Sequence, residues 1–122
     1  MQRVLLLGST GYLGRTLMFY LQKTGHVVPT YRTQPLFASS YRCDFWTDNV
    51  RSQVEHHQID TVLIAANMAY EAADSACAFT HFQKKAEQLI RGCQQCRIIY
   101  ISSDGVFDGK KGNYTESDIP TP

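Results

Sequence analysis

The sequence predicts an α/β fold with one parallel sheet, and three features of the chain lead to that prediction. Short apolar runs alternate with segments of helical periodicity, which is the pattern of successive β–α–β units. The runs are apolar throughout rather than alternating with polar residues, so they indicate strands that are buried on both faces. A glycine-rich turn separates the first apolar run from the first helical segment, where folds of this class bind phosphate groups.

Length, charge and cysteine content exclude several classes of protein. The chain has 122 residues, enough for one domain with one modest core. Its formal net charge is +1 and its apolar runs are short, so we expect neither a nucleic-acid partner nor a membrane span. Val4–Leu7 runs directly into the glycine turn and does not form a signal peptide. Four cysteines are too few for a disulfide framework, so we expect a reducing, cytoplasmic compartment.

The first expected strand is Arg3–Leu7, and the turn Gly8-Ser9-Thr10-Gly11-Tyr12-Leu13-Gly14 follows it. Each glycine has its own physical reason. Gly8 allows a sharp turn off the strand, Gly11 lets the backbone approach a pyrophosphate, and Gly14 lets the helix pack close to the strand. This turn therefore predicts dinucleotide binding.

The same turn supplies hydrogen-bond donors. The free N–H groups of Thr10, Tyr12 and Leu13 would point at the phosphates, helped by the positive end of the helix dipole. A glycine turn with a purely structural purpose is the alternative. The strand before it and the helix after it favour cofactor binding.

The first helix should end near Gly25, and its expected buried stripe consists of Leu13, Leu17, Tyr20 and Leu21. His26–Tyr31 follows as the second strand. Pro29 cannot donate to a sheet ladder, so we expect a distortion there.

Arg32 stands where the second strand should end, a position that meets the adenosine ribose in dinucleotide-binding folds. An acidic side chain there accepts from the 2′-hydroxyl, whereas an arginine accommodates a 2′-phosphate. No Asp or Glu occurs between Val27 and Tyr41, so Arg32 favours NADP over NAD. A solvated arginine in a loop is the alternative.

A very short third strand is expected at Tyr41-Arg42-Cys43, and it ends at Asp44-Phe45. A carboxylate at this strand end could accept from the amino group of adenine, and a turn aspartate is the alternative. Thr47 or Asp48 should cap a weak helix that follows, with one face formed by Val50, Val54 and His57.

The sequence contains two pairs of potential metal ligands, and we expect neither pair to bind a metal. His56 and His57 are adjacent on a helix and do not face the same way, so we expect ordinary surface histidines. Cys93 and Cys96 have redox or zinc spacing, but they stand at a helix end before a strand and no second pair exists. We interpret them as a helix-face cysteine and a loop cysteine.

The second half of the chain continues the alternation. Asp60–Ala66 is the fourth strand, and a loop over 67–74 lies at its carboxyl end, where open α/β sheets bind ligands. A helix begins at Ser75, and its expected core face consists of Phe79, Phe82, Ala86, Leu89, Ile90 and Cys93. Arg97–Ser102 is the fifth strand, and 103–122 has no clear element. Right-handed crossovers then predict a Rossmann-type sheet in the order 3-2-1-4-5, with helices on both faces.

The last strand and the polar segment after it carry a longer motif. Ile101-Ser102-Ser103-Asp104-Gly105-Val106-Phe107-Asp108-Gly109, then Tyr114-Thr115-Glu116-Ser117-Asp118 and Pro120-Thr121-Pro122, resembles the dTDP-4-dehydrorhamnose reductase family of extended short-chain dehydrogenases. With the glycine turn, this resemblance covers the whole chain. It implies reduction of a 4-keto sugar nucleotide by NADPH or NADH.

The resemblance also implies roles for particular positions. Ser103 matches the catalytic Ser or Thr, whose hydroxyl would donate to the keto oxygen. Gly8, Gly11, Tyr12 and Leu13 would bind the pyrophosphate. Arg32 would contact the ribose, and Asp44 and Phe45 the adenine. Ala65, Ala66 and Asn67 would line the cofactor on the fourth strand. The order Ala65-Ala66-Asn67 differs from the family, in which the asparagine precedes the alanines.

The family's Tyr-x-x-x-Lys pair does not occur before Pro122. We therefore expect residues 1–122 to be a dinucleotide-binding domain without its C-terminal part, inactive as it stands. One face of strands four and five should then be bare, and the missing part or another copy of the chain would cover it. Two alternatives remain: a non-catalytic regulatory module that binds NAD(P), and another extended short-chain member such as an epimerase or dehydratase.

Overall fold

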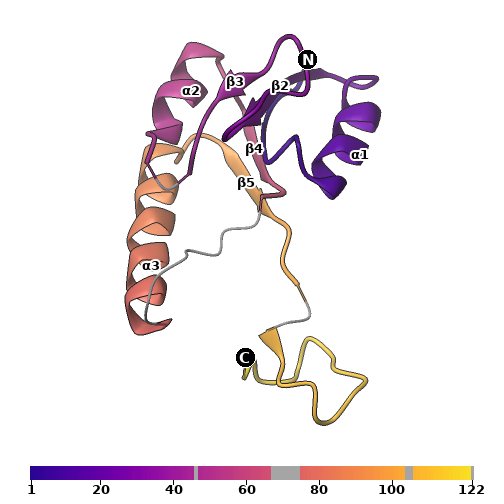
Figure 1. Cartoon of the computed structure of the whole chain (residues 1–122), viewed down its shortest axis with the longest axis vertical. Helices are drawn as coiled ribbons and strands as arrows, with labels where there is room; N and C mark the ends of the chain where they lie inside the picture. The colour runs from indigo at the N-terminus through magenta and orange to yellow at the C-terminus, as the bar shows by residue number, and fades with distance from the viewer. Residues whose placement is uncertain (46, 67–74, 104–105, 122) are drawn as a thin grey trace.

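The computed structural model describes residues 1–45, 47–66, 75–103 and 106–121, and places most of them around one sheet (Figure 1). Five parallel strands lie in the order β3-β2-β1-β4-β5. Along the chain the elements are β1 (Arg3–Leu7), α1 (Tyr12–Leu21), β2 (His26–Tyr31), β3 (Tyr41–Arg42), α2 (Val50–His56), β4 (Thr61–Ile64), α3 (Ser75–Gly92) and β5 (Arg97–Tyr100). The predicted Rossmann-type sheet and its strand order are confirmed.

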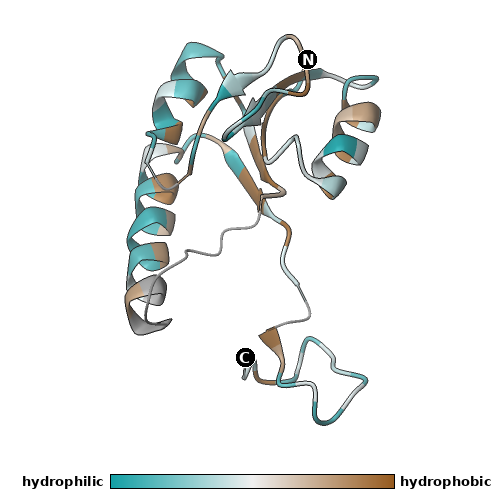
Figure 2. Cartoon of the chain, viewed as in Figure 1, coloured by the Kyte–Doolittle hydropathy of each residue, from teal (hydrophilic) through white to brown (hydrophobic). Residues whose placement is uncertain are grey.

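Helices cover the two faces of the sheet, as predicted. Leu5 and Leu7 of β1 point into the larger cluster with the buried side chains of α2 and α3, whereas Val4 and Leu6 pack with Met18 of α1. Figure 2 shows apolar strands in the middle and helices that alternate between polar and apolar residues. Successive side chains of β1 point to opposite faces of the sheet, and both faces are buried. This explains why β1 is apolar at nearly every position.

The buried stripe of α1 differs from the prediction by a rotation of the helix. Leu13 and Tyr20 are 39% and 62% exposed, while the positions that face the sheet are Gly14, Leu17, Met18 and Leu21. Gly14 explains the rotation, because a Cβ on this residue would lie 1.9 Å from the carbonyl oxygen of Gly8. The helix also ends earlier than expected, at Leu21, and Gln22 rather than Gly25 is its C-cap.

Pro29 does not distort β2, contrary to our expectation. The strand runs without interruption through Pro29, which pairs with Leu6. His26 donates its N–H to the carbonyl of Gln2, just before β1, and the carbonyl of Tyr31 accepts on the β3 side from the N–H of Cys43. Because alternate residues of a strand face opposite neighbours, the Pro29 nitrogen faces β3, whose ladder begins one residue later at Thr30. The missing donor is thus not needed there.

The cap of α2 is Asn49, not Thr47 or Asp48. The Asn49 side chain accepts from the N–H of Arg51 at 3.0 Å. The Asp48 carboxylate accepts instead from the N–H of Asp44 at 2.7 Å. The Asp48 carboxylate does not cap α2, because it is hydrogen-bonded within the turn that precedes the helix.

The prediction of two ordinary surface histidines is wrong for His57, whose ring is partly buried. Its ring centroid lies 4.2 Å from that of Tyr41, and its buried Nε2 has no hydrogen-bond partner within the described part of the chain. Burial lowers the pKa of His57, and the charges of His56 and His26 lower it further.

The expectation of bare strands holds only for β5. Every residue of β4 is buried, because α1 and its neighbours cover Leu63. On β5, at the edge of the sheet, Ile99 and Tyr100 are 41% and 50% exposed. Both strands are also shorter than expected.

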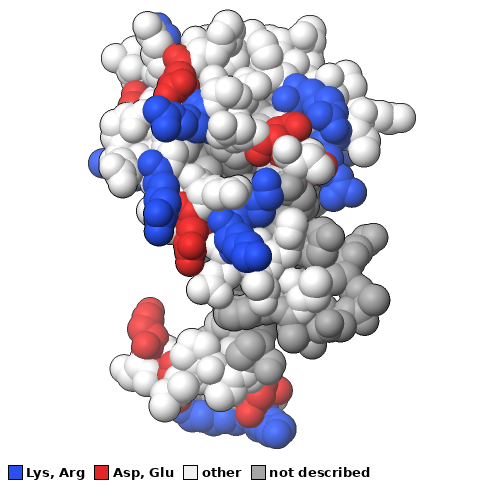
Figure 3. Space-filling model, turned by 90° about the vertical axis from the view of Figure 1, so that its left-hand side faces the viewer, with Lys and Arg blue, Asp and Glu red and all other residues white. Residues whose placement is uncertain are grey.

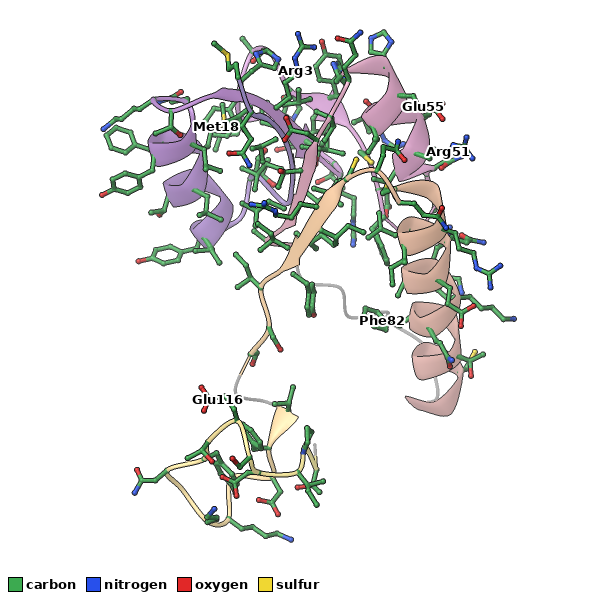
Figure 4. All side chains as sticks on the ribbon, turned by 180° about the vertical axis from the view of Figure 1, so that it is seen from behind. Arg3, Met18, Arg51, Glu55, Phe82 and Glu116 are labelled. Atoms are coloured by element: carbon green, nitrogen blue, oxygen red, sulfur yellow. The ribbon has the colours of Figure 1, made fainter. Side chains whose placement is uncertain are left out.

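The core face of α3 is narrower than its predicted stripe. Phe82 points from the helix toward the sheet (Figure 4), and Leu89 and the adjoining Cys93 are buried. Ile90 is 58% exposed, so its assignment to this face is wrong. The side chain of Phe79 lies outside the described residues.

After β5 the chain leaves the sheet, and residues 106–121 fold on themselves without an α-helix or a strand (Figure 1). The rings of Phe107 and Tyr114 stack at 4.5 Å, and the N–H of Thr121 donates to the carbonyl of Val106 at 2.9 Å. The Tyr114 hydroxyl donates to the carboxylate of Asp108. This segment is ordered by its own side chains rather than by packing on the sheet.

Candidate functional site

A cleft of about 210 Å³ lies at the carboxyl ends of the central strands. The last residues of β1 and β2 contribute to it, together with residues that directly follow each of β1 to β4. The lining residues are Leu7, Gly8, Thr10, Gly11, Tyr31, Arg32, Cys43, Asp44, Phe45, Ala65 and Ala66. This edge is where open α/β sheets bind ligands, and the fold places the predicted glycine turn and strand ends around one hollow.

The glycine turn brings backbone to the floor of the cleft. Gly8 has φ +88°, and a Cβ on it would lie 2.6 Å from the nitrogen of Ala66, so only glycine fits there. Gly11 differs, because its φ is −72° and a Cβ would lie 3.6 Å from its nearest neighbour, the oxygen of Gly8. Gly11 is therefore not required by the fold, and its missing side chain leaves the cleft open.

The N-terminus of α1 opens at the same place. Gly11 is the N-cap residue and provides no side-chain hydrogen bond to the first turn. Backbone N–H groups of a first helical turn have no partner within the helix, and the helix dipole adds partial positive charge. The Nε of Arg15 donates to the carbonyl of Thr10 at 2.9 Å and holds the turn from outside. This end of the cleft can bind an anion.

Two buried hydroxyl groups fix the turn to the sheet. Ser9 Oγ donates to the carbonyl of Thr30 at 2.7 Å, and Thr30 Oγ1 donates to the carbonyl of Leu6 at 2.9 Å. Both side chains are fully buried. Sequence reasoning missed this pair, and the only signal is a small hydroxyl residue within an apolar strand.

The far end of the cleft contains Asp44, Phe45 and Arg32. Phe45 is buried and supplies an apolar wall, and Asp44 is half-buried. Cys43 lies between these elements, and sequence reasoning missed it together with Leu7 and Tyr31. Burial is the main cause that raises the pKa of the Cys43 thiol to about 11, followed by the carboxylates of Asp48 and Asp44. Cys43 is thus a neutral thiol at ordinary pH.

Some predicted site residues do not line the cleft. Tyr12 and Leu13 are 93% and 39% exposed and are not among the lining residues, while Gly14 packs against Gly8. Asn67 lies outside the described residues. Ser103 is exposed and is not part of the cleft wall.

Ser103 nevertheless leaves the sheet at the cleft's edge. It stands three residues after the end of β5, much as Ala65 and Ala66 follow β4, and the ends of these two parallel strands are paired at Ile64 and Tyr100. The polar segment after β5 therefore begins on the ligand-binding side of the sheet.

A larger groove of about 440 Å³ lies between α2 and α3, on the other side of Phe45. Its rim includes Arg51, which forms an ion pair with Glu55 at 2.7 Å. Figure 3 shows positive and negative side chains interspersed over this side of the molecule. The groove contains no strand ends and no glycine turn, so the smaller cleft is the better candidate site.

The described ranges contain neither a cluster of metal ligands nor a helix that could span a membrane. No group of at least three His, Cys, Asp or Glu side chains could hold a metal ion. Within the same ranges, each helix is too short or too polar to cross a membrane.

Comparison with known proteins agrees with the geometry. A hypothetical dTDP-4-dehydrorhamnose reductase from Sulfolobus tokodaii is 28% identical, with a TM-score of 0.81 over 99% of this chain. MoeE5, solved in complex with UDP-glucose and NAD, is 27% identical, with a TM-score of 0.73 over 98% of this chain. The methionine adenosyltransferase 2 subunit beta of Rattus norvegicus is 32% identical over 140 aligned positions, which include 99% of this chain.

These relatives are longer proteins. This chain covers 46% and 42% of the two solved chains and 38% of the rat subunit. The family model described as RmlD substrate binding domain matches residues 1–122. Since that match extends over the whole chain, this chain belongs to the RmlD substrate binding domain family.

Proposed function

We propose that this chain binds NADP or NAD as the dinucleotide-binding domain of a sugar-nucleotide reductase. One observation supports this above the others: the cleft at the strand ends has a floor of backbone. Gly8 cannot carry a side chain there, and Gly11 could but does not. A pyrophosphate needs such close backbone approach beside a helix N-terminus.

The proposed placement of the cofactor follows the cleft from end to end. The glycine turn, with Thr10 and the N–H groups of Tyr12 and Leu13, binds the pyrophosphate. Ala65 and Ala66 line the cofactor next to β4, and Asn67, the next residue in the sequence, is proposed to contribute as well. Asp44 and Phe45 receive the adenine. The exposed Tyr12 and Leu13 side chains take no part, because a phosphate would use only their main-chain donors.

Arg32 favours NADP over NAD in this proposal. It lines the cleft at the end of β2, where a 2′-phosphate would meet its guanidinium group. Replacing Arg32 with Asp should reverse the preference toward NADH, because a carboxylate repels the phosphate and accepts from a 2′-hydroxyl. Unchanged relative affinities for NADPH and NADH would refute this role.

The proposed chemistry reduces a 4-keto sugar nucleotide. The cofactor, when bound, supplies the hydride to the keto carbon. The Ser103 hydroxyl donates a hydrogen bond to the keto oxygen and stabilises its growing negative charge. The nascent alkoxide also needs a proton, which the family's Tyr-Lys pair would supply and this chain does not contain. Residues 1–122 should therefore bind the cofactor without turnover, with the substrate segment and the proton donor coming from outside them.

The first test is isothermal titration of the full chain with NADPH and NADH. We expect saturable binding of both at one site, with NADPH preferred. Absence of binding to either dinucleotide would refute the proposed function. When a 4-keto sugar nucleotide is added with NADPH, this chain alone should not oxidise the cofactor.

A non-catalytic role is the second candidate, and one relative favours it. The rat protein that is 32% identical is named as a subunit of another enzyme. In that case the longer protein that contains this sequence would bind NAD(P) and a partner protein without reducing a sugar. Turnover of a 4-keto sugar nucleotide by that longer protein separates the two candidates.

An epimerase or dehydratase, the third possibility, would return the hydride and leave the cofactor unchanged after each cycle.

Two further parts of the proposal concern setting and assembly. Cys43, Cys93 and Cys96 form no disulfide, which agrees with the proposed reducing cytoplasm. We also propose that β5 mediates self-association of this chain. It is an edge strand with exposed Ile99 and Tyr100, and such an edge offers unpaired backbone groups as well as apolar surface.

A further inference from the structure

The groove between α2 and α3 is closed at one end, where the two helices touch. A Cβ on Gly92 would lie 3.1 Å from the Cβ of Arg51, so the helices meet at these two residues. Figure 4 shows Arg51 at this end of α3. Lys85, Leu89 and Gly92 follow one another at i, i+4 and i+7, so they share one face of α3 and line the groove together.

The groove has an apolar floor and a polar rim. Phe45, Val50 and Leu89 line it although they are only 8%, 5% and 7% exposed. The rest of the lining is polar and includes the amide side chains of Asn49 and Gln88. Small-molecule sites combine such a buried apolar surface with a few polar groups at the edge, so the floor suits a planar ring.

The charges around the groove do not balance. Asp48 and Arg51 line it, and both already have partners of opposite charge, at 3.2 and 2.7 Å. Lys85 and Arg91 line it as well, and neither forms an ion pair with a side chain of the described ranges. Two positive charges therefore remain, and they favour an anionic ligand.

This groove is separate from the cofactor cleft. Among the described residues, Phe45 lines both hollows and every other lining residue belongs to one of them. A dinucleotide in the cleft would therefore leave the groove free. The groove's volume of about 440 Å³ lies within the range of small-molecule sites, roughly 300 to 1,000 Å³.

We propose that the groove binds a phosphate ester with a planar ring, of the size of a nucleoside monophosphate. The ring packs against Phe45, Val50 and Leu89, and the phosphate accepts hydrogen bonds from Lys85 and Arg91. A phosphate ester carries about 1.5 to 2 negative charges near neutral pH, which matches the two unpaired cations. Inorganic phosphate would use only the cations and an uncharged nucleoside only the floor, so tight binding requires both parts of the ligand.

Isothermal titration of the full chain with uridine 5′-monophosphate tests this inference, with uridine and inorganic phosphate as partial probes. We expect saturable binding of the nucleotide at one site, roughly tenfold tighter than binding of either partial probe, because only the nucleotide adds a charged hydrogen-bonding group to an apolar contact. Saturating NADPH should leave this affinity unchanged, because the cofactor cleft is a separate hollow.

Two substitutions remove the proposed phosphate ligands. Lys85→Gln should weaken binding of uridine 5′-monophosphate about fivefold, and Lys85→Gln combined with Arg91→Gln about twentyfold, since each removes a charged hydrogen-bond donor. Lys84→Gln is the matched control. Lys84 is an exposed residue of the same helix with the same charge, but it does not line the groove, so this variant should keep the wild-type affinity.

Each outcome decides. Absence of saturable binding to the wild-type chain overturns the inference, and so does inorganic phosphate that binds as tightly as the nucleotide. Equal losses in Lys84→Gln and Lys85→Gln overturn it as well, because they indicate general attraction to a positively charged helix. Competition by NADPH would place the nucleotide in the cofactor cleft instead. A wild-type chain that binds neither NADPH nor NADH refutes the proposed function, and the same variants then still decide about the groove.

Discussion

Two Gly→Ala substitutions in the same turn should have opposite effects, and they test the role of each glycine. At Gly14 the new methyl group would lie 1.9 Å from the carbonyl oxygen of Gly8, a backbone atom that cannot rotate away. At Gly11 it would lie 3.6 Å from that same oxygen, an ordinary contact distance. The fold therefore forbids a side chain at one position and tolerates it at the other.

The magnitudes follow from these distances. Overpacking a rigid site costs about 3 kcal/mol, and alanine returns about 1 kcal/mol of helix propensity, so Gly14→Ala should lower the free energy of unfolding by about 2 kcal/mol. At Gly11, alanine restricts the unfolded chain, which gains about 0.5 kcal/mol, and it is a poorer N-cap by a similar amount. Gly11→Ala should thus be as stable as the wild-type chain.

Gly11→Ala, which should keep its stability, should instead weaken cofactor binding. The methyl group of Gly11→Ala enters the cleft that the pyrophosphate would occupy, and we expect at least a tenfold loss of NADPH affinity, equivalent to about 1.4 kcal/mol. Urea unfolding followed by circular dichroism measures stability, and isothermal titration measures affinity. Wild-type affinity in Gly11→Ala would refute the placement of the pyrophosphate. Wild-type stability in Gly14→Ala would refute the close packing of α1 against the turn.

Three other predictions concern the remaining parts of the fold. Burial lowers the pKa of His57 below its ordinary value of 6.5, so the unfolded chain binds a proton more readily and stability should fall as the pH drops through 6.5. His57→Gln should flatten the dependence of the urea midpoint on pH between about 7 and 5, and an unchanged slope would contradict this role of His57. Thr30→Val removes the hydrogen bond to the Leu6 carbonyl and should lower the free energy of unfolding by about 1 kcal/mol, and no loss would show that this bond contributes nothing. Ile99→Lys should shift sedimentation of the chain toward the monomer, and an unchanged distribution would exclude β5 as the contact between copies.

The order of the strands could be predicted because it depends on local patterns. Apolar runs, helical segments and right-handed crossovers together allow few arrangements, and the glycine turn determines where the first β–α unit bends. The cleft residues at strand ends followed from the same reasoning, since parallel strands end at one edge. Arg32, Asp44 and Ala66 lie around one hollow for this reason.

The rotation of α1, the cap of α2 and the covered face of β4 could not be read from periodicity. Tyr20 fits a helical stripe as well as Met18 does, and only the contact between Gly14 and Gly8 decides which of them is buried. Asp48 and Asn49 are equally good cap residues by sequence alone, and Asp48 does not cap because its carboxylate accepts from the main chain of Asp44.

The sequence by itself determined the strand order and the edge at which the cleft forms, because short-range patterning and chain connectivity are sufficient for both. Only the tertiary structure decided that Leu7, Tyr31 and Cys43 join the predicted residues around that cleft. Cys43 and Tyr31 carry no local signal of their place, and the buried pair of Ser9 and Thr30 carries only its hydroxyl groups. Their partners lie on other strands, and close packing selects among residues that are equivalent along the chain.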